Sequence, residues 1–239
     1  MSDILVLAET ENNYLHSTAG ELIAAGRKLA DELGNQVCAV ITDDVDESSF
    51  KHLIHLGADK VYVISHAELS KGNIDAFVSY LEQICIQINP NVILTSRTYM
   101  GRNIGARIAY RLESGVAQDC IDVEIDKNSS RVIATRPVYG GNAVARFTFN
   151  QDDPQVIILR VKSFDSNEID TTRNGSIEKL NISIDNDAIK LKLIETVKEE
   201  SEGIRLEDAP VIVAGGRGLG GPEPFKQLEE LANIFDGAV

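Results

Sequence analysis

The sequence contains no tryptophan and only three cysteines among its 239 residues. Cys38, Cys85 and Cys120 are far apart and form no Cys-x-x-Cys pair, which argues against a disulfide framework and against a zinc site. The longest apolar runs, such as residues 4–8 and 156–159, fall far short of the roughly 20 residues that cross a bilayer. These absences predict reduced, buried thiols and no membrane insertion.

Basic residues are also scarce, since 23 Lys and Arg stand against 37 Asp and Glu and give a formal net charge of −14. Duplex nucleic acid and anionic membranes would be repelled unless a local basic patch overcame this field, and the sequence shows no such patch. The N-terminus passes from Met1 straight into an apolar run, without the basic start of a secretory signal. We therefore expect a cytoplasmic protein that binds no nucleic acid.

Hydrophobic residues make up 43% of the chain, enough for a sizeable core, and they follow an alternating pattern. Continuous apolar runs at 4–8, 37–42, 61–65 and 92–96 predict buried strands, and helical periodicity predicts helices from Thr18 to Gly34 and over 48–56, 74–88 and 100–112. Thr18 with Glu21 is typical of a capping box, and Gly34 of a C-terminal cap. The alternation predicts a doubly wound α/β fold with a parallel sheet.

After Gly115 the pattern changes to short apolar runs without helices between them, at 122–126, 131–138, 143–150 and 155–161. We expect these to be antiparallel strands at the edge of the sheet. Residues 139–142, Tyr-Gly-Gly-Asn, are typical of a hairpin turn, because glycine and asparagine tolerate positive φ. These runs complete a predicted N-terminal α/β domain over residues 1–163.

The remainder divides into a polar segment and a short C-terminal piece. Residues 164–208 are expected to be a linker with short strands at 182–184 and 189–194. Residues 209–239 are expected to be the first β-α unit of a second α/β domain, truncated after its first helix. Residues 211–214 are strand-like there, and the helix is predicted to begin near Pro224.

The main candidate site is the sequence Gly-Gly-Arg-Gly-Leu-Gly-Gly that follows residue 214. Its Gly216-x-Gly218-x-x-Gly221 spacing matches the dinucleotide fingerprint, in which glycines let the backbone approach a phosphate. Arg217 adds a permanent cation with forked donors. Gly216, Arg217 and Gly218 are therefore the candidate cofactor-binding residues. Two features weaken the match, because prolines precede the helix and Asp236 follows the first helix directly, so a flexible glycine turn remains the alternative.

Two further constellations leave the choice between a functional and a structural interpretation open. Residues 95–102 combine hydroxyls with Arg97 and Arg102 at a strand end, where open α/β sheets bind ligands, and suit either an anion site or a capped loop. His52 and His55 could share one helix face and a metal, although a solvated face is the more common arrangement. The sequence carries no nucleophile elbow, Walker lysine or other pattern of covalent catalysis, so no catalytic residue is assigned.

Four stretches of the chain resemble the alpha subunit of an electron transfer flavoprotein. They are residues 92–95 leading into Gly-Arg-Asn-Ile-Gly-Ala-Arg-Ile-Ala at 101–109, residues 116–123, Arg-Pro-Val-Tyr-Gly-Gly-Asn-Ala at 136–143, and residues 211–223 with their Gly-Gly-Arg-Gly-Leu core. The third and fourth stretches together in one chain are specific to that family. The resemblance implies a nucleotide alpha-hydrolase-like fold for the N-terminal domain.

The resemblance also implies a function and partners. Such a chain forms a heterodimer with a beta subunit, and FAD takes electrons from flavin dehydrogenases and passes them to a downstream acceptor. By the same resemblance, Arg217 is an FAD-binding residue on the phosphate and ribose part of the cofactor, whereas AMP belongs only to the beta subunit. The chain is then an electron carrier rather than a catalyst of bond chemistry.

Further flavin-binding segments of the family, such as a Gly-Ala-Ser-Arg stretch, do not occur in this sequence. We therefore expect that the 239-residue chain alone does not hold FAD tightly. Two alternatives follow from the same residues: a nucleotide-binding or regulatory α/β module without flavin, and an interaction scaffold that binds only a beta-like chain.

Overall fold

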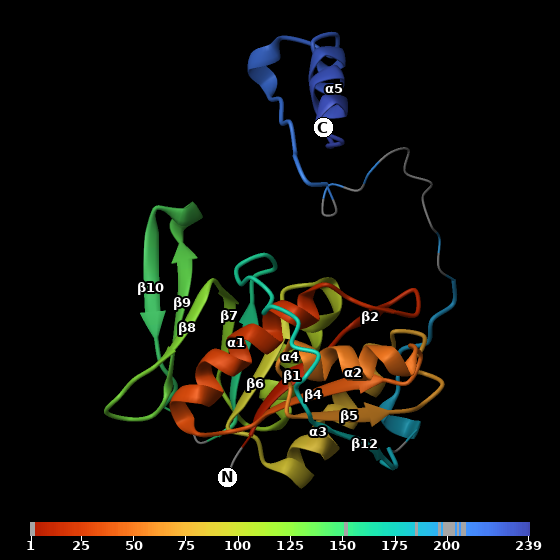
Figure 1. Ribbon diagram of the computed structural model, residues 1–239, viewed down its shortest axis with the longest axis vertical. Coiled ribbons are helices and arrows are strands. Elements are labelled where there is room, and N and C mark those ends of the chain that lie inside the picture. The colour runs from red at the N-terminus through yellow and green to blue at the C-terminus, as the bar shows by residue number, and fades with distance from the viewer. Residues whose placement is uncertain are drawn as a thin grey trace. The chain divides into compact units, whose positions relative to one another are not determined.

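The computed structural model describes residues 3–150, 153–184, 186–195, 197, 204, 206 and 209–239. The chain divides into two compact units, Met1–Leu193 and Ile194–Val239, and both are drawn in Figure 1. No helix in the described ranges is long and apolar enough to cross a membrane. The division lies beyond the predicted boundary at residue 163.

A seven-stranded parallel sheet forms the centre of the N-terminal unit. Its strands are β1 (Ile4–Leu7), β4 (Val37–Thr42), β5 (Lys60–Ile64), β6 (Val92–Ser96), β7 (Val116–Cys120), β11 (Gln155–Leu159) and β12 (Ser176–Leu180). They lie in the order β12-β5-β4-β1-β6-β11-β7. The chain moves outward from β1 to β5 on one side and restarts at β6 on the other, so a topological switch point lies between β1 and β6.

Helices cover both faces of this sheet (Figure 1). They are α1 (Thr18–Leu33), α2 (Glu47–Leu56), α3 (Ile74–Ile88) and α4 (Tyr99–Arg111). Leu22 of α1 and Leu53 of α2 pack in one core cluster with Ile4 of β1. Leu81 of α3 and the neighbouring α4 pack in a second cluster with Leu5 of β1. Successive strand residues thus face opposite helix layers, which explains the continuous apolar runs and confirms the predicted doubly wound fold.

Of the two caps predicted for α1, the structure confirms the C-terminal one only. Gly34 ends the helix in the left-handed region, with φ of 69°, as predicted. At the other end the N-cap is Ser17, which makes no side-chain capping bond. The capping box of Thr18 and Glu21 is wrong, because the Glu21 carboxylate instead accepts the backbone N–H of Lys162 at 2.7 Å.

The strands after β7 do not all join the edge of the parallel sheet. β8 (Asp122–Ile125), β9 (Val132–Val138) and β10 (Ala143–Phe147) form a separate antiparallel sheet in the order β10-β9-β8. β11 lies inside the parallel sheet, between β6 and β7. The expectation of an antiparallel edge strand at 155–161 is therefore wrong, and the complete burial of β11 fits a strand with neighbours on both sides.

Three hairpins connect the antiparallel strands described in this unit, and one of them joins β8 to β9 through residues 126–131. Residues Tyr139–Gly141 form the short 3₁₀ turn η1 between β9 and β10, which confirms the predicted hairpin. Tyr139, Gly140 and Gly141 all have positive φ, of 52°, 67° and 93°. A smaller hairpin joins β2 (Thr10–Glu11) to β3 (Tyr14–Leu15) directly after β1.

Residues 164–193 of the predicted linker lie within the N-terminal unit. β12 pairs in parallel with β5, and Arg173 just before it binds Asp59 at 2.6 Å. The short strands predicted at 182–184 and 189–194 are not formed, and a 3₁₀ turn, η2 (Asn186–Ala188), lies between them. Much of the remaining linker up to residue 208 lies outside the described residues.

The second unit contains a 3₁₀ turn, η3 (Arg217–Leu219), and one helix, α5 (Phe225–Ile234). Its predicted strand at 211–214 forms only a parallel bridge between Ile212 and Ala238. A side chain at Gly237 would collide with the carbonyl oxygen of Val211, so glycine is required where the two segments pass. The helix begins directly after Pro224, as predicted.

The three cysteines are all buried and unpaired. Burial is the main cause that raises the pKa of each thiol to about 12. Their positions in the core confirm the prediction that they act as small hydrophobic residues, and their reduced state stays a prediction.

Candidate functional site

The glycine-rich turn of the second unit carries the predicted cofactor-binding residues. The turn runs from Gly216, whose backbone is extended, through η3 to Gly220, which is left-handed with φ of 80°. Packing or backbone conformation explains why positions 215 and 220, at the two ends of the turn, are glycine. A side chain at Gly215 would collide with Leu228, and Gly220 needs its positive φ.

Neither packing nor backbone conformation explains why positions 216 and 218 are glycine. Neither has a positive φ, and an added Cβ would meet nothing within 4 Å at either position. Their glycine identity leaves open space beside the backbone, where a ligand could approach closely. Both flank Arg217 in the sequence, so the three predicted residues do lie together in one exposed turn.

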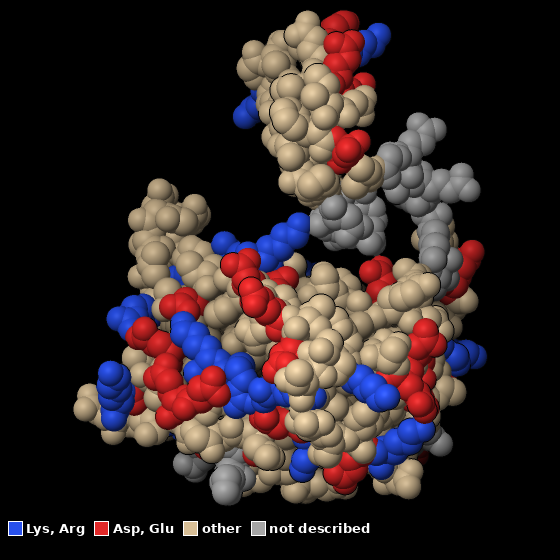
Figure 2. Space-filling view, viewed as in Figure 1, with Lys and Arg blue, Asp and Glu red and all other residues tan. Residues whose placement is uncertain are grey.

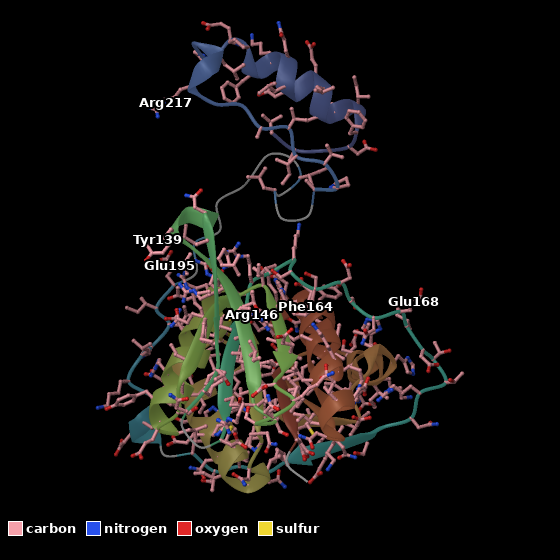
Figure 3. The ribbon with its side chains drawn as sticks, turned by 90° about the vertical axis from the view of Figure 1, so that its left-hand side faces the viewer. Tyr139, Arg146, Phe164, Glu168, Glu195 and Arg217 are labelled. Atoms are coloured by element: carbon pink, nitrogen blue, oxygen red, sulfur yellow. The ribbon has the colours of Figure 1, made fainter. Side chains whose placement is uncertain are left out.

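Arg217 is exposed and projects away from α5 (Figure 3). Among the described residues it has no ion pair, so its guanidinium is available to an anion. Five N–H donors in a planar fork suit a phosphate or pyrophosphate group. The turn is followed by the N-terminus of α5, whose backbone N–H groups also favour negative charge. The residues present thus fit the phosphate part of a dinucleotide.

Asp236 does not occupy the place of the acidic residue in a dinucleotide fingerprint. It follows α5 directly, with φ of 49°, and comes before Ala238, which makes the parallel bridge. In the fingerprint, the acidic residue follows the second strand and binds the ribose. Gly221 likewise lies outside the helix, as predicted.

The N-terminal unit offers a second place for a ligand, at the switch point of its sheet. There the carboxyl ends of β1 and β6 lead into Glu9 and Thr98. The Thr98 hydroxyl lies 2.8 Å from both carboxylate oxygens of Glu9 and caps α4 by accepting the Gly101 N–H, also at 2.8 Å. An added Cβ at Gly101 would lie 2.6 Å from Glu9 Oε1, so the carboxylate is packed against the first turn of α4.

Glu9 therefore occupies the position at which a helix N-terminus would otherwise receive an external anion. Its side chain is buried, and burial raises its pKa to about 7, although the bond from Thr98 acts in the opposite direction. A ligand phosphate would have to displace this carboxyl group or accept repulsion from its ionised form. The switch point is thus poorly suited to a nucleotide.

The segment 95–102 corresponds better to a capped loop than to an anion site. Thr95 and Ser96 are buried in β6, and Thr98 caps α4. Arg102 lies over the ring of Tyr99, 5.7 Å from its centroid. Arg97 points elsewhere and pairs with Asp119 at 3.3 Å. The two arginines therefore do not converge on one ligand.

His52 and His55, which the sequence analysis considered as a possible metal pair, both lie on α2. In the ranges that the structure describes, no group of three or more His, Cys, Asp or Glu side chains is arranged to hold a metal ion. His52 lines a hollow with Leu56 and Ser166, and the backbone carbonyl of His55 accepts the N–H of Asp170 at 3.0 Å. The histidines fit a structural position on the helix surface.

Charge on the N-terminal unit is mixed. Figure 2 shows acidic and basic side chains interspersed over the visible face. Ion pairs account for part of this pattern, for example Lys28 of α1 with Asp122 of β8 at 2.8 Å. On that face, the described residues form no broad basic area of the kind that binds duplex nucleic acid.

Sequence analysis missed one arginine cluster, because its members are far apart along the chain. Arg97, Asp119, Arg136 and Arg160 meet beside the β9–β10 hairpin, around a hollow of about 390 Å³ lined by Asp119, Arg136, Arg160 and the hairpin tip. The only local signal was the glycine pair after Tyr139, which marks the turn. No spacing rule connects an arginine at 160 with an aspartate at 119.

Comparison with known proteins identifies the family. Residues 4–185 match the model of the electron transfer flavoprotein domain. The chain is 36% identical over 237 residues to the electron transfer flavoprotein subunit alpha of Thermoanaerobacterium thermosaccharolyticum, a match that covers 99% of this chain and 72% of that protein. It is 34% identical to the subunit alpha of Megasphaera elsdenii and 33% to that of Bacillus subtilis, with 99% of this chain and 70% of each relative covered. The chain therefore belongs to the electron transfer flavoprotein family, on the alpha-subunit side, and its role is electron transfer.

Proposed function

We propose that this chain carries part of an FAD site in its glycine-rich turn and works as a heterodimer with an electron transfer flavoprotein beta subunit. In this proposal, Arg217 binds the pyrophosphate of FAD, and Gly216 and Gly218 let the backbone come close to it. The bound flavin would supply the electron chemistry, taking electrons from flavin dehydrogenases and passing them to a downstream acceptor. The protein's own residues bind and orient it.

The observation that carries this proposal is the exposed Arg217, which forms no ion pair with any residue that the structure describes and lies between two glycines that neither packing nor φ requires. A turn that served only to connect two segments would not need these three residues. Phosphate recognition accounts for all of them together, because it needs a forked cation and a backbone without side chains.

The decisive experiment is co-expression of the chain with the beta subunit from the same organism. We expect a stable complex, and a higher flavin content in the complex than in the chain alone, measured by visible absorption after gel filtration. Arg217→Gln should lower FAD affinity at least tenfold in a fluorescence titration, because it removes a charge-assisted bond. Lys226→Gln, which removes an exposed cation from α5, is the matched control and should leave the affinity unchanged.

Two results would contradict the proposal. One is equal FAD affinity in Arg217→Gln and the unaltered chain. The other is the absence of any complex with the beta subunit at micromolar concentrations. Tight, stoichiometric FAD in the isolated chain would contradict the narrower expectation that this chain alone holds FAD weakly.

The alternative of a nucleotide-binding module has one observation in its favour, which is the parallel sheet with a switch point between β1 and β6. The buried Glu9 argues against it. We therefore expect AMP and ATP to leave the melting temperature of the N-terminal unit unchanged. In the proposed heterodimer, AMP belongs to the beta subunit.

A further inference from the structure

A hollow beside the β9–β10 hairpin has features of an anion site. It lies where the carboxyl ends of three neighbouring parallel strands meet, since Asp119 is on β7 and Arg97 and Arg160 directly follow β6 and β11. Its volume is about 390 Å³, enough for a phosphate group with part of a larger molecule. Open α/β sheets bind ligands at this edge. All residues that line the hollow belong to the N-terminal unit.

The charge at the hollow is positive, in contrast to the net charge of −14 on the whole chain. Arg160 forms a two-pronged pair with Asp119, with both N–H···O distances at 2.8 Å, and Arg97 approaches the same carboxylate at 3.3 Å. The hydrogen bonds from Arg160 are the main cause that lowers the pKa of Asp119, while burial opposes them and the charges of Arg97 and Arg136 add to them. Three guanidinium groups thus surround one ionised carboxylate.

Arg136 has unused hydrogen-bonding capacity. Its Nε atom is buried and has no hydrogen-bond partner within the part of the chain that the structure describes. Buried polar atoms are almost always paired, so an unpaired guanidinium nitrogen requires an explanation. The side chain lines the hollow, where a bound anion would provide the missing acceptor.

The hairpin tip completes the rim of the hollow. Tyr139 lies at the end of the hairpin (Figure 3). Its φ is 52° and it is 84% exposed. The left-handed region is unfavourable for an aromatic residue, and such strain is common at ligand sites. Added Cβ atoms at Gly140 and Gly141 would meet nothing within 4 Å, so the backbone of the rim is open to a ligand.

We propose that this hollow binds a doubly charged oxyanion of the phosphate class, held by Arg136 and Arg160, which line it, while Arg97 adds positive charge beside Asp119. The net charge of the cluster, three cations against one carboxylate, matches a dianion better than a single carboxylate. Guanidinium forks also match phosphate oxygens in geometry. The phosphate could be inorganic or belong to a phosphoester, and the experiment separates these sources.

The test uses the full chain at low ionic strength, where charge interactions are least screened. Inorganic phosphate, pyrophosphate and glycerol phosphate, a phosphoester without a nucleoside, are titrated separately by isothermal calorimetry. We expect binding of at least one of them, with a tenfold or greater loss in Arg136→Gln and a smaller loss in Arg136→Lys. Arg111→Gln is the matched control, because this arginine pairs with Glu82 on the α3–α4 surface, and it should bind as the unaltered chain does.

If Arg136→Gln fails to fold by circular dichroism, Arg160→Gln replaces it, since that side chain lines the hollow, is 42% exposed and can be changed with little effect on the core. Absence of binding by all three anions, or equal binding in the arginine variants and the unaltered chain, overturns the proposal. Binding of a glutamate-rich peptide without binding of phosphate also overturns it, because it would indicate a protein-docking surface. FAD affinity of the heterodimer should not change in Arg136→Gln, so the result is independent of the function proposed above.

Discussion

The two units of the chain differ in how their structure is maintained. In the N-terminal unit, β1, β4, β6 and β11 are buried at every residue, and helices close both faces of the sheet. In the second unit, Ala232 is the only buried residue among those described, while Ile234 is 76% and Phe235 53% exposed. Exposed apolar area of this kind is typical of a contact surface. The comparison indicates that the first unit is stabilised by its own core, whereas most described side chains of the second are exposed or only partly buried.

The largest expected effect tests this contrast directly. Ile93→Ala in β6 should lower the free energy of unfolding by about 4 kcal/mol, because it opens a cavity at a site with no exposure. Leu231→Ala in α5, at a residue that is 44% exposed, should cost less than about 1 kcal/mol. Urea denaturation of both variants measures the difference. Similar losses in the two units would refute the contrast.

A smaller effect is expected where β12 joins the N-terminal unit. Asp59 binds Arg27 at 2.5 Å, Arg173 at 2.6 Å and the Val37 N–H at 2.9 Å. Burial opposes its ionisation, but these bonds outweigh burial and lower its pKa. Asp59→Ala should therefore cost about 2–3 kcal/mol at pH 7, after allowance for partial exposure.

The stability lost in Asp59→Ala should also depend on pH, which gives a second test of the same contact. A carboxyl group with a lowered folded-state pKa contributes stability above its unfolded pKa of about 4 and loses it as the pH falls further. The cost of Asp59→Ala should therefore shrink toward pH 3 in urea denaturation. Asp31→Ala removes another partner of Arg27, on the exposed side of α1, and should cost less than about 0.5 kcal/mol. Equal costs for the two variants would show that Asp59 does not connect β12 to the sheet.

Glu9 should produce a pH effect of opposite sign. Its folded-state pKa is raised to about 7 by burial, so the folded state binds a proton that the unfolded chain releases between about pH 4.5 and 7. Stability from this group is complete at low pH and falls as the pH rises to 7. Glu9→Gln should therefore stabilise the chain more at pH 8 than at pH 5, by up to about 3 kcal/mol.

Thermal or urea unfolding at the two pH values checks this effect, with the exposed Glu32→Gln as control. A difference between pH 8 and pH 5 that is the same for both variants would contradict the role of burial at Glu9. Binding of AMP by Glu9→Gln, but not by the unaltered chain, would further support the view that the carboxyl group excludes a phosphate from the switch point.

The smallest expected effect concerns the glycine-rich turn. Gly220→Ala should cost about 1 kcal/mol within the second unit, because alanine is unfavourable at φ of 80°. Gly216→Ala and Gly218→Ala should change stability by less than about 0.5 kcal/mol, because their Cβ atoms meet open space. Hydrogen exchange of α5 measures these changes. A large loss at Gly216 would assign that glycine to the fold and remove it from the proposed FAD site.

The sequence predicted the alternating strands and helices of residues 4–112 well, because burial on both sheet faces leaves continuous apolar runs that local patterns record. It did not predict the position of β11, since strand order depends on which distant neighbours pair, and it missed β7, whose Ala-Gln-Asp sequence is not apolar. Glu9 was missed for a related reason. Its burial results from Thr98 and Gly101, which are far from it in the sequence.

The candidate site was predictable only in part. The glycines and Arg217 were found from local spacing and family resemblance, and their assignment to FAD remains a proposal. The arginine cluster beside the hairpin depends on three strand ends that only the folded sheet brings together. The composition of a strongly acidic chain therefore gave no sign of a local cluster of positive charge. Arg136 and Tyr139 do belong to the stretch that carries the family resemblance, but that stretch did not predict the cluster.

The burial of all three cysteines has a practical consequence. Because each thiol has a pKa of about 12 and is at most 4% exposed, maleimide reagents at neutral pH should leave the native chain unmodified. A single cysteine introduced at an exposed position, such as Lys226 of α5 or Tyr110 of α4, would then be the sole point of attachment for a dye or spin label. The native protein is thus a suitable background for attaching a single label at a chosen position.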